Sequence, residues 1–124
     1  MILGIGTDLL DVARMAAELS GKGEGFRDAV FTPDEIAYCE AKRYPARHFA
    51  ARFAAKEALF KALSGKVPDG AWRDVEVVRP EGSPPGLRLA GGVKETADRL
   101  GVTKILVTLS HTEGLAAASV LLEG

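Results

Sequence analysis

The chain has 124 residues, with 16 Lys or Arg against 17 Asp or Glu, so its net charge is −1. A chain of this length predicts one domain, spanning residues 1–124. The near-zero charge argues against nucleic acid or a membrane surface as a partner, and no apolar run approaches the ~20 residues that would span a bilayer.

The N-terminal segment predicts a strand, a short helix and a loop, in that order. ILGIGTD (residues 2–8) has the composition of a strand, and DVARMAAEL (11–19) has the pattern of a helix with Asp11 as its cap. The glycine-rich stretch SGKGEG (20–25) predicts a loop.

Two helices are predicted in the middle of the chain. Thr32, Pro33 and Glu35 have the spacing of a capping box with proline at the first helical position. The longest helix is predicted over residues 45–63, because a proline opens it and Ser64-Gly65 can end it.

Strands dominate the C-terminal half. The predicted elements are strands at 72–80, 86–90, 104–111 and 115–123, a turn at 81–86, a helix at 91–101, and a tight turn through Thr112, Glu113 and Gly114. This order predicts the α+β fold class, with a small antiparallel sheet packed by the long central helix.

The first strand has one face that is almost without side chains. Because alternate residues share a face, Gly4 and Gly6 lie beside Ile2 and Asp8. Glycine inside a strand often marks the close approach of another backbone or a ligand. We therefore expect a closely packed neighbour on this face, with Asp8 at its end.

The long helix can supply that neighbour. Aromatic and leucine side chains gather on one arc of RHFAARFAAKEALFKAL, and alanines cover much of the remainder. If the face with Ala50 and Ala54 packs on Gly4 and Gly6, Asp8 and Glu57 come together. Three simpler explanations stay open: a surface ion pair between Glu57 and Lys61, a helix cap at Asp8, and alanines chosen for helix propensity.

Charge and cysteine content give two further expectations. Residues 42–61 contain six Lys or Arg and one acidic residue, which fits either an anionic partner or an ordinary solvated helix face. The lone Cys39 cannot form an intramolecular disulfide, and the start MILGIG lacks the basic region of a signal peptide. We therefore expect a cytoplasmic location.

Three motifs together, GIGTDLLDVARM, RFAAKEALFKA and VTLSHTEGLAAASVLLE, resemble the holo-[acyl-carrier-protein] synthase family of small 4′-phosphopantetheinyl transferases. The resemblance runs from Met1 to Glu123 and implies that family's fold. It also implies Mg²⁺-dependent transfer of the 4′-phosphopantetheine arm of coenzyme A to a serine of apo acyl carrier protein, with release of adenosine 3′,5′-bisphosphate. Homotrimers with active sites at subunit interfaces, and a place in fatty acid biosynthesis, are implied as well.

The resemblance assigns roles to individual residues. Asp8 and Glu57 match the metal carboxylates, and Lys61 matches the lysine near the phosphates and the nucleophile, so these three are the catalytic candidates. Arg14 matches an arginine that docks the acidic carrier protein. His111 matches a position close to the coenzyme A phosphates, although a histidine before a tight turn can also simply hydrogen-bond that turn.

Further coenzyme contacts are expected at Arg52, Ser64, Gly65 and Pro84. Lys56 falls in a basic position of the motif, with a looser expected role in coenzyme or partner contact, or a buried stem with its amine reaching solvent. Three places depart from the family pattern: Ser64-Gly65-Lys66, Glu81-Gly82-Ser83-Pro84 and Leu115. The turn at residues 81–84 lacks the usual basic residue, and Lys66 is a candidate to compensate.

The expected chemistry suits these residue types. Mg²⁺ takes one or two carboxylates together with substrate phosphates, and lysine adds a positive point charge. The acceptor of the serine proton stays open between Glu57, Lys61 and water. A transferase for polyketide or peptide-synthesis carriers and an inactive coenzyme-binding scaffold are the alternatives. Leu121 and Leu122 point to opposite faces of the last strand, which fits either a subunit interface or a central strand covered by a helix.

Overall fold

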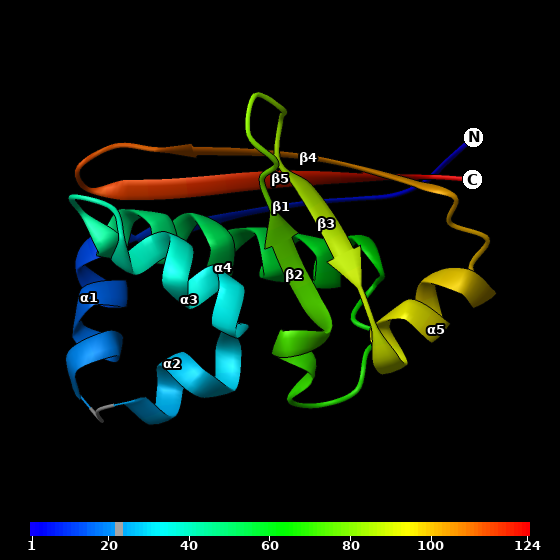
Figure 1. Cartoon of the computed structure of the whole chain (residues 1–124). Helices are drawn as coiled ribbons and strands as arrows, with labels where there is room; N and C mark the ends of the chain where they lie inside the picture. The colour runs from blue at the N-terminus through cyan, green and yellow to red at the C-terminus, as the bar shows by residue number, and fades with distance from the viewer. Residues whose placement is uncertain (22–23) are drawn as a thin grey trace.

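An antiparallel three-stranded sheet with the order β1-β5-β4 forms one layer of the molecule (Figure 1). The computed structural model describes residues 1–21 and 24–124. The strands of this sheet are β1 (Ile2–Asp11), β4 (Lys104–His111) and β5 (Leu115–Glu123). A separate two-stranded sheet consists of β2 (Val75–Val78) and β3 (Gly86–Leu89).

Helices cover one face of the three-stranded sheet, and α4 runs along it (Figure 1). The helices are α1 (Val12–Gly21), α2 (Glu24–Val30), α3 (Pro33–Glu40), α4 (Pro45–Ala62), the 3₁₀ turn η1 (Ala71–Asp74) and α5 (Gly91–Arg99). The α+β class and the long central helix are thus confirmed. Within the described ranges, no helix combines the length and apolar character that crossing a bilayer requires.

Three predicted boundaries are wrong. The first strand continues to Asp11 because β5 supplies partners along its length, up to the pairing of Asp11 with Leu115. The loop predicted at 20–25 is partly helical, since α1 continues to Gly21 and α2 begins at Glu24, while residues 22–23 lie outside the described ones. The strand predicted at 72–80 begins as η1 and is only four residues long, Val75–Val78.

The glycine face of β1 permits the close approach of α4. A Cβ atom added to Gly4 would overlap the backbone oxygen of Ala62, and one added to Gly6 would overlap that of Ala58. The predicted docking of the long helix on this face is right, but the closest contacts lie further along the helix than Ala50 and Ala54. Both of those alanines are fully buried.

The core has two parts, one at each end of α4. The C-terminal half of the helix packs with the three-stranded sheet, β2 and α5, and the N-terminal half packs with α1, α3 and the residues that follow α2. The buried residues of this core include Phe31, Phe49, Leu59 and Val120. Helix α4 is therefore buried on most of its circumference, which explains its high alanine content.

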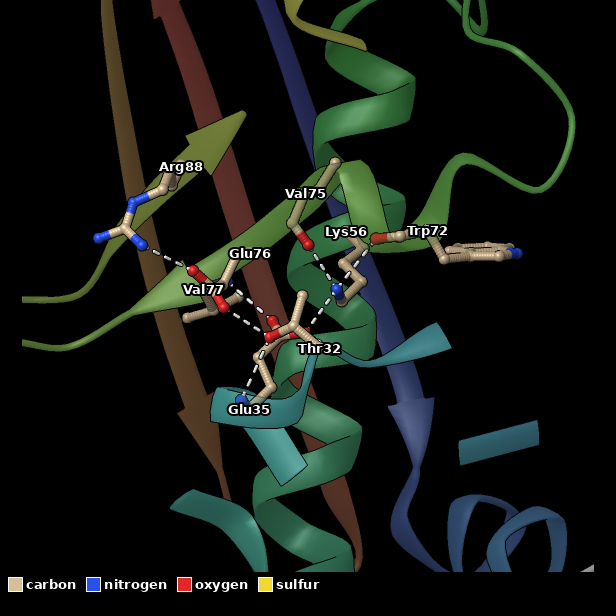
Figure 2. A network of polar contacts seen from close by, with 8 residues as sticks. All are labelled: Thr32, Glu35, Lys56, Trp72, Val75, Glu76, Val77 and Arg88. Carbon is tan, nitrogen blue, oxygen red and sulfur yellow. Dashed lines mark hydrogen bonds and ion pairs between the residues drawn. The ribbon is translucent and has the colours of Figure 1, made fainter. Parts of the chain in front are cut away.

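A buried polar network ties α4 to α3 and β2 (Figure 2). The Lys56 ammonium is completely buried and donates to Glu35 Oε1 at 2.7 Å, to the Trp72 carbonyl oxygen at 3.0 Å and to the Val75 carbonyl oxygen. Glu35 Oε2 accepts from the Val77 amide at 2.8 Å. The expected role of Lys56 in coenzyme or partner contact is wrong, because its amine has no route to solvent and is satisfied inside the protein.

Glu35 also closes the predicted capping box. Its side chain accepts from the Thr32 amide at 2.9 Å, while Thr32 Oγ1 accepts from the Glu35 amide. Thr32 Oγ1 donates in turn to Glu76 Oε2 at 2.6 Å, and Glu76 pairs with Arg88 (Figure 2). The cap and the buried lysine therefore share one carboxylate, which fixes α3 against α4.

Candidate active site

Asp8 and Glu57 face one pocket between β1, α1 and α4. Asp8 pairs with Ala118 of β5, and strand alternation places it on the same face as Gly4 and Gly6. The pocket has a volume of about 320 Å³ and is lined by residues that include Asp8, Arg14, Glu18, Phe53 and Glu57. We call it the Asp8–Glu57 pocket.

The two carboxylates influence each other electrostatically. Burial raises the pKa of Glu57, the negative charge of Asp8 raises it further, and Lys61 acts in the opposite direction. Two like charges at a partly buried site favour the binding of a positive ion. Glu57 therefore lies where a cation would offset its unfavourable charge.

Lys61 bridges from α4 to β1. Its Nζ donates to Asp8 Oδ1 at 3.0 Å and to the Thr7 carbonyl oxygen at 3.0 Å. The side chain of Lys61 is 56% exposed and that of Asp8 is 19% exposed. Asp8 is not a helix cap, since β1 continues for three residues beyond it before α1 begins.

The donor set fits Mg²⁺. Among residues 1–21 and 24–124 no cluster of three or more His, Cys, Asp or Glu is arranged to hold a metal. Mg²⁺ commonly takes only one or two protein carboxylates and completes its shell with water and substrate phosphates. A pair of carboxylates, one of them with a raised pKa, is therefore a suitable protein contribution.

Arg52 and His111 belong to a second group of side chains. Arg52 is 4% exposed, and its guanidinium carbon lies 4.0 Å from the centre of the Tyr38 ring. His111, at the end of β4, has its ring centre 4.9 Å from that of His48. In the following turn, the Thr112 amide donates to the Leu115 carbonyl oxygen at 2.8 Å, and among residues 1–21 and 24–124 the His111 ring makes no hydrogen bond to this turn.

Sequence reasoning missed His48 and Tyr38 as members of this group. Their rings also contact each other, with centres 6.0 Å apart. The sequence held one indication of this group: His48 stands four residues before Arg52, so the two side chains lie on the same face of the helix. Only the fold brings His111, at the end of β4, beside His48.

The remaining expected coenzyme contacts lie outside the Asp8–Glu57 pocket. Ser64 and Gly65 follow α4 with φ values of 58° and 70°, and the Gly65 amide donates to the Phe60 carbonyl oxygen at 2.8 Å. Pro84 is exposed in the loop that joins β2 to β3, which extends away from both strands (Figure 1). Arg14, by contrast, is exposed on α1 and lines the pocket.

Comparison with known proteins shows the family to which the chain belongs. The model of the 4′-phosphopantetheinyl transferase superfamily matches residues 4–119. A holo-[acyl-carrier-protein] synthase of Anaeromyxobacter sp. (strain K) is 47% identical over 128 residues, covering 100% of this chain and 98% of that protein. The chain therefore belongs to the 4′-phosphopantetheinyl transferase superfamily and, within it, to the holo-[acyl-carrier-protein] synthase family of enzymes.

Solved structures of the same family share the fold along the whole chain. The synthase of Neisseria meningitidis superposes with a TM-score of 0.88 at 28% identity, covering 100% of both chains. The synthase of Helicobacter pylori, in complex with coenzyme A, has a TM-score of 0.81 at 26% identity and covers 96% of this chain and 99% of that one.

Proposed function

We propose that this enzyme transfers the 4′-phosphopantetheine arm of coenzyme A to a serine hydroxyl of apo acyl carrier protein in a Mg²⁺-dependent reaction. The observation that carries the proposal is the pocket in which Asp8 and Glu57 come together beside Lys61. Membership of the holo-[acyl-carrier-protein] synthase family supports the same activity.

Balanced chemistry defines what the site must do. The serine oxygen bonds to the phosphorus that carries the pantetheine arm, the bond from that phosphorus to the leaving phosphate breaks, and adenosine 3′,5′-bisphosphate departs. The serine proton passes in the same reaction to Glu57, Lys61 or a water molecule. Negative charge therefore builds on phosphate oxygens, and catalysis depends mainly on positioning and charge stabilisation.

Asp8, Glu57 and the neighbouring Lys61 each have a part in that task. Asp8 and Glu57 would hold Mg²⁺, which when bound neutralises and orients the diphosphate. Lys61 holds Asp8 in place through its 3.0 Å hydrogen bond and, with a 56% exposed side chain, keeps donors for the substrate phosphates.

We assign substrate contacts to the surrounding residues. Arg52 and His111 contribute positive charge or hydrogen-bond donors to the coenzyme, and Ser64, Gly65 and Pro84 are exposed positions at which its nucleotide end can lie. Arg14 is exposed beside the pocket and suits the acidic surface of a carrier protein. The proposed setting is fatty acid biosynthesis in the cytoplasm.

A homotrimer is part of the proposal, and the uncovered sheet face supports it. Ile5 pairs with Leu121 and Leu121 with Leu106, so these side chains form a row across the three strands on the face away from α4. Ile5 is 72% exposed and Leu106 is 46% exposed. Apolar side chains gathered at this level of exposure typically mark a protein interface.

Mass spectrometry tests the activity directly. Purified apo acyl carrier protein is incubated with the enzyme, coenzyme A and Mg²⁺, and we expect it to gain the mass of one phosphopantetheine arm. Asp8→Asn should remove the gain while leaving the circular dichroism spectrum unchanged. Modification of the carrier at the normal rate by Asp8→Asn would contradict the proposed metal role.

A further inference from the structure

We infer that His48, together with His111 and Arg52, forms a binding site for a phosphate dianion that takes up a proton on His48 when the anion binds. The inference rests on the proposed function, because coenzyme A supplies such phosphates. It adds a residue, His48, and a proton linkage that the assigned site residues do not include.

The first observation is an unsatisfied donor. Arg52 is 4% exposed, and its Nε has no hydrogen-bond partner among the described residues. Its guanidinium lies over the Tyr38 ring, whose centre is also 4.5 Å from Lys42 Nζ. A buried donor without a partner is costly, and an anion is the ligand that satisfies an arginine best.

The second observation is the contact between two imidazoles in a field of positive charge. The ring centres of His48 and His111 are 4.9 Å apart, and His111 is exposed, so a ligand can reach the pair. The groups that act most strongly on the charge of His48 come from three parts of the chain. They are His111 at the end of β4, Lys42 after α3, and Arg47 and Arg52 on α4.

These groups leave His48 uncharged in the free protein. Burial lowers the pKa of His48 most, and His111, Arg52, Lys42 and Arg47 lower it further, to about 4. An anion reverses the electrostatic part of this effect. An opposite charge within ~4–6 Å of a titratable group typically shifts its pKa by about 1–3 units toward the charged form.

Proton uptake has a defined sign for binding. Because the bound form holds the proton more tightly, anion affinity rises as the pH falls through the pKa of His48 in the complex, and the rise ends near its pKa in the free protein, about 4. The gain is at most about tenfold per pH unit for one proton. The affinity of wild type for coenzyme A, relative to that of His48→Gln, should therefore rise as the pH falls, because the titration of the coenzyme's own phosphate is common to both proteins.

Proton NMR can follow both imidazoles separately, because the chain has two histidines. We would titrate the full-length protein between about pH 5 and pH 8 in sodium chloride and in sodium sulfate at matched ionic strength, with His48→Gln to assign the signals. Sulfate is the probe because it stays a dianion, whereas a phosphate ester itself titrates with a pKa near ~6.

The expected result is a His48 signal that stays flat in chloride and titrates in sulfate, with its midpoint raised by about 1–3 units. A signal that is flat in saturating sulfate, or that moves equally in chloride, overturns the inference.

A second arm with coenzyme A separates this inference from the proposed function. Calorimetry of wild type and His48→Gln across the same pH range should show a ratio of wild-type to variant affinity that rises as the pH falls, since the coenzyme's own titration affects both proteins equally. If the enzyme modifies the carrier protein but His48 does not respond to sulfate, the anion site is contradicted and the proposed function stands. If His48 responds to sulfate but the carrier protein is not modified, the proposed function is contradicted and the anion site stands.

Discussion

Glu57 carries an electrostatic cost in the folded protein that a bound cation would offset. Its pKa is raised by burial and by the charge of Asp8, so ionising the carboxylate costs more free energy in the folded protein than in the unfolded chain. Residues placed in this way commonly trade stability for function.

The first prediction therefore concerns Glu57→Gln. Because the folded pKa lies above the ordinary value of 4.5, the stability of the wild-type protein falls as the pH rises through that window. The glutamine variant should melt at a higher temperature than wild type near neutral pH without Mg²⁺, and the gap should close as the pH approaches 4.5. Differential scanning calorimetry across pH measures this.

The activity of Glu57→Gln should fall although its melting temperature rises. We expect Glu57→Gln to lose at least ~100-fold in carrier modification, because it removes half of the carboxylate pair. Glu113→Gln, in the exposed turn after β4, is the matched control and should behave as wild type. A Glu57→Gln protein that melts lower than wild type at neutral pH would contradict the electrostatic account.

At the level of elements, two contacts set the position of α4. The bare face of β1 allows the helix backbone to approach, and the buried Lys56–Glu35 pair fixes the opposite side of the helix to α3 and β2. Together they hold Glu57 toward Asp8.

Gly6→Ala tests the approach of α4 to β1. An alanine Cβ would overlap the backbone oxygen of Ala58, and backbone cannot move aside as a side chain can. We expect a loss of about 3 kcal/mol in the free energy of unfolding, the upper end of the usual range for overpacking, together with weaker Mg²⁺ binding. Urea denaturation and calorimetry measure the two effects.

Gly25→Ala is the control, since a Cβ at that exposed helical position meets nothing within 4 Å. Its free energy of unfolding should stay within about 0.5 kcal/mol of wild type. Equal stability of the Gly6 and Gly25 variants would refute the close-approach explanation.

Lys56→Met tests the buried pair. Removal of the ammonium leaves Glu35 with an uncompensated charge, and breaking a buried ion pair in this way typically costs about 3–5 kcal/mol. Adding Glu35→Gln should recover part of the loss because the amide is uncharged. Chemical denaturation of the single and double variants gives both numbers.

An exposed pair provides the comparison. Lys94 and Asp98 on α5 are 2.7 Å apart, with side chains 55% and 56% exposed. Lys94→Met should therefore lower the free energy of unfolding by no more than about 0.5 kcal/mol. If Lys56→Met were equally mild, the buried network would not be what fixes α4.

For the whole molecule, the uncovered sheet face is the main feature. Its apolar row lies on the opposite side of the sheet from α4, so association through it would leave the helical layer accessible. The pocket and the row thus occupy different faces of the same three strands.

Ile5→Glu should convert the proposed trimer into monomers. A charge in the middle of an apolar interface has no partner and costs several kcal/mol to bury, so association becomes unfavourable. Size-exclusion chromatography with light scattering measures the mass, which should fall to that of one chain. Leu100→Glu, at a 42% exposed leucine after α5, is the control and should leave the mass unchanged.

Local chemistry in the sequence determined the elements and the motif residues. The two apolar segments joined by a tight turn predicted β4 and β5 with their observed bounds, and the capping box at Thr32–Glu35 is formed as expected. The glycine face of β1 predicted a closely packed neighbour, because a strand face without Cβ atoms lets another backbone approach closely. The boundaries of β1 and η1 were missed because strand pairing and packing, rather than local propensity, set them.

Tertiary structure alone decided which charged residues meet. Lys56 and Glu57 are neighbours in one motif, yet one is completely buried against Glu35 and the other faces Asp8, since adjacent helical residues point about 100° apart. His48 meets His111 for the same kind of reason, through the packing of α4 against the sheet. A sequence specifies which side chains are available, but only the folded chain sets the distances on which their pKa values and binding depend.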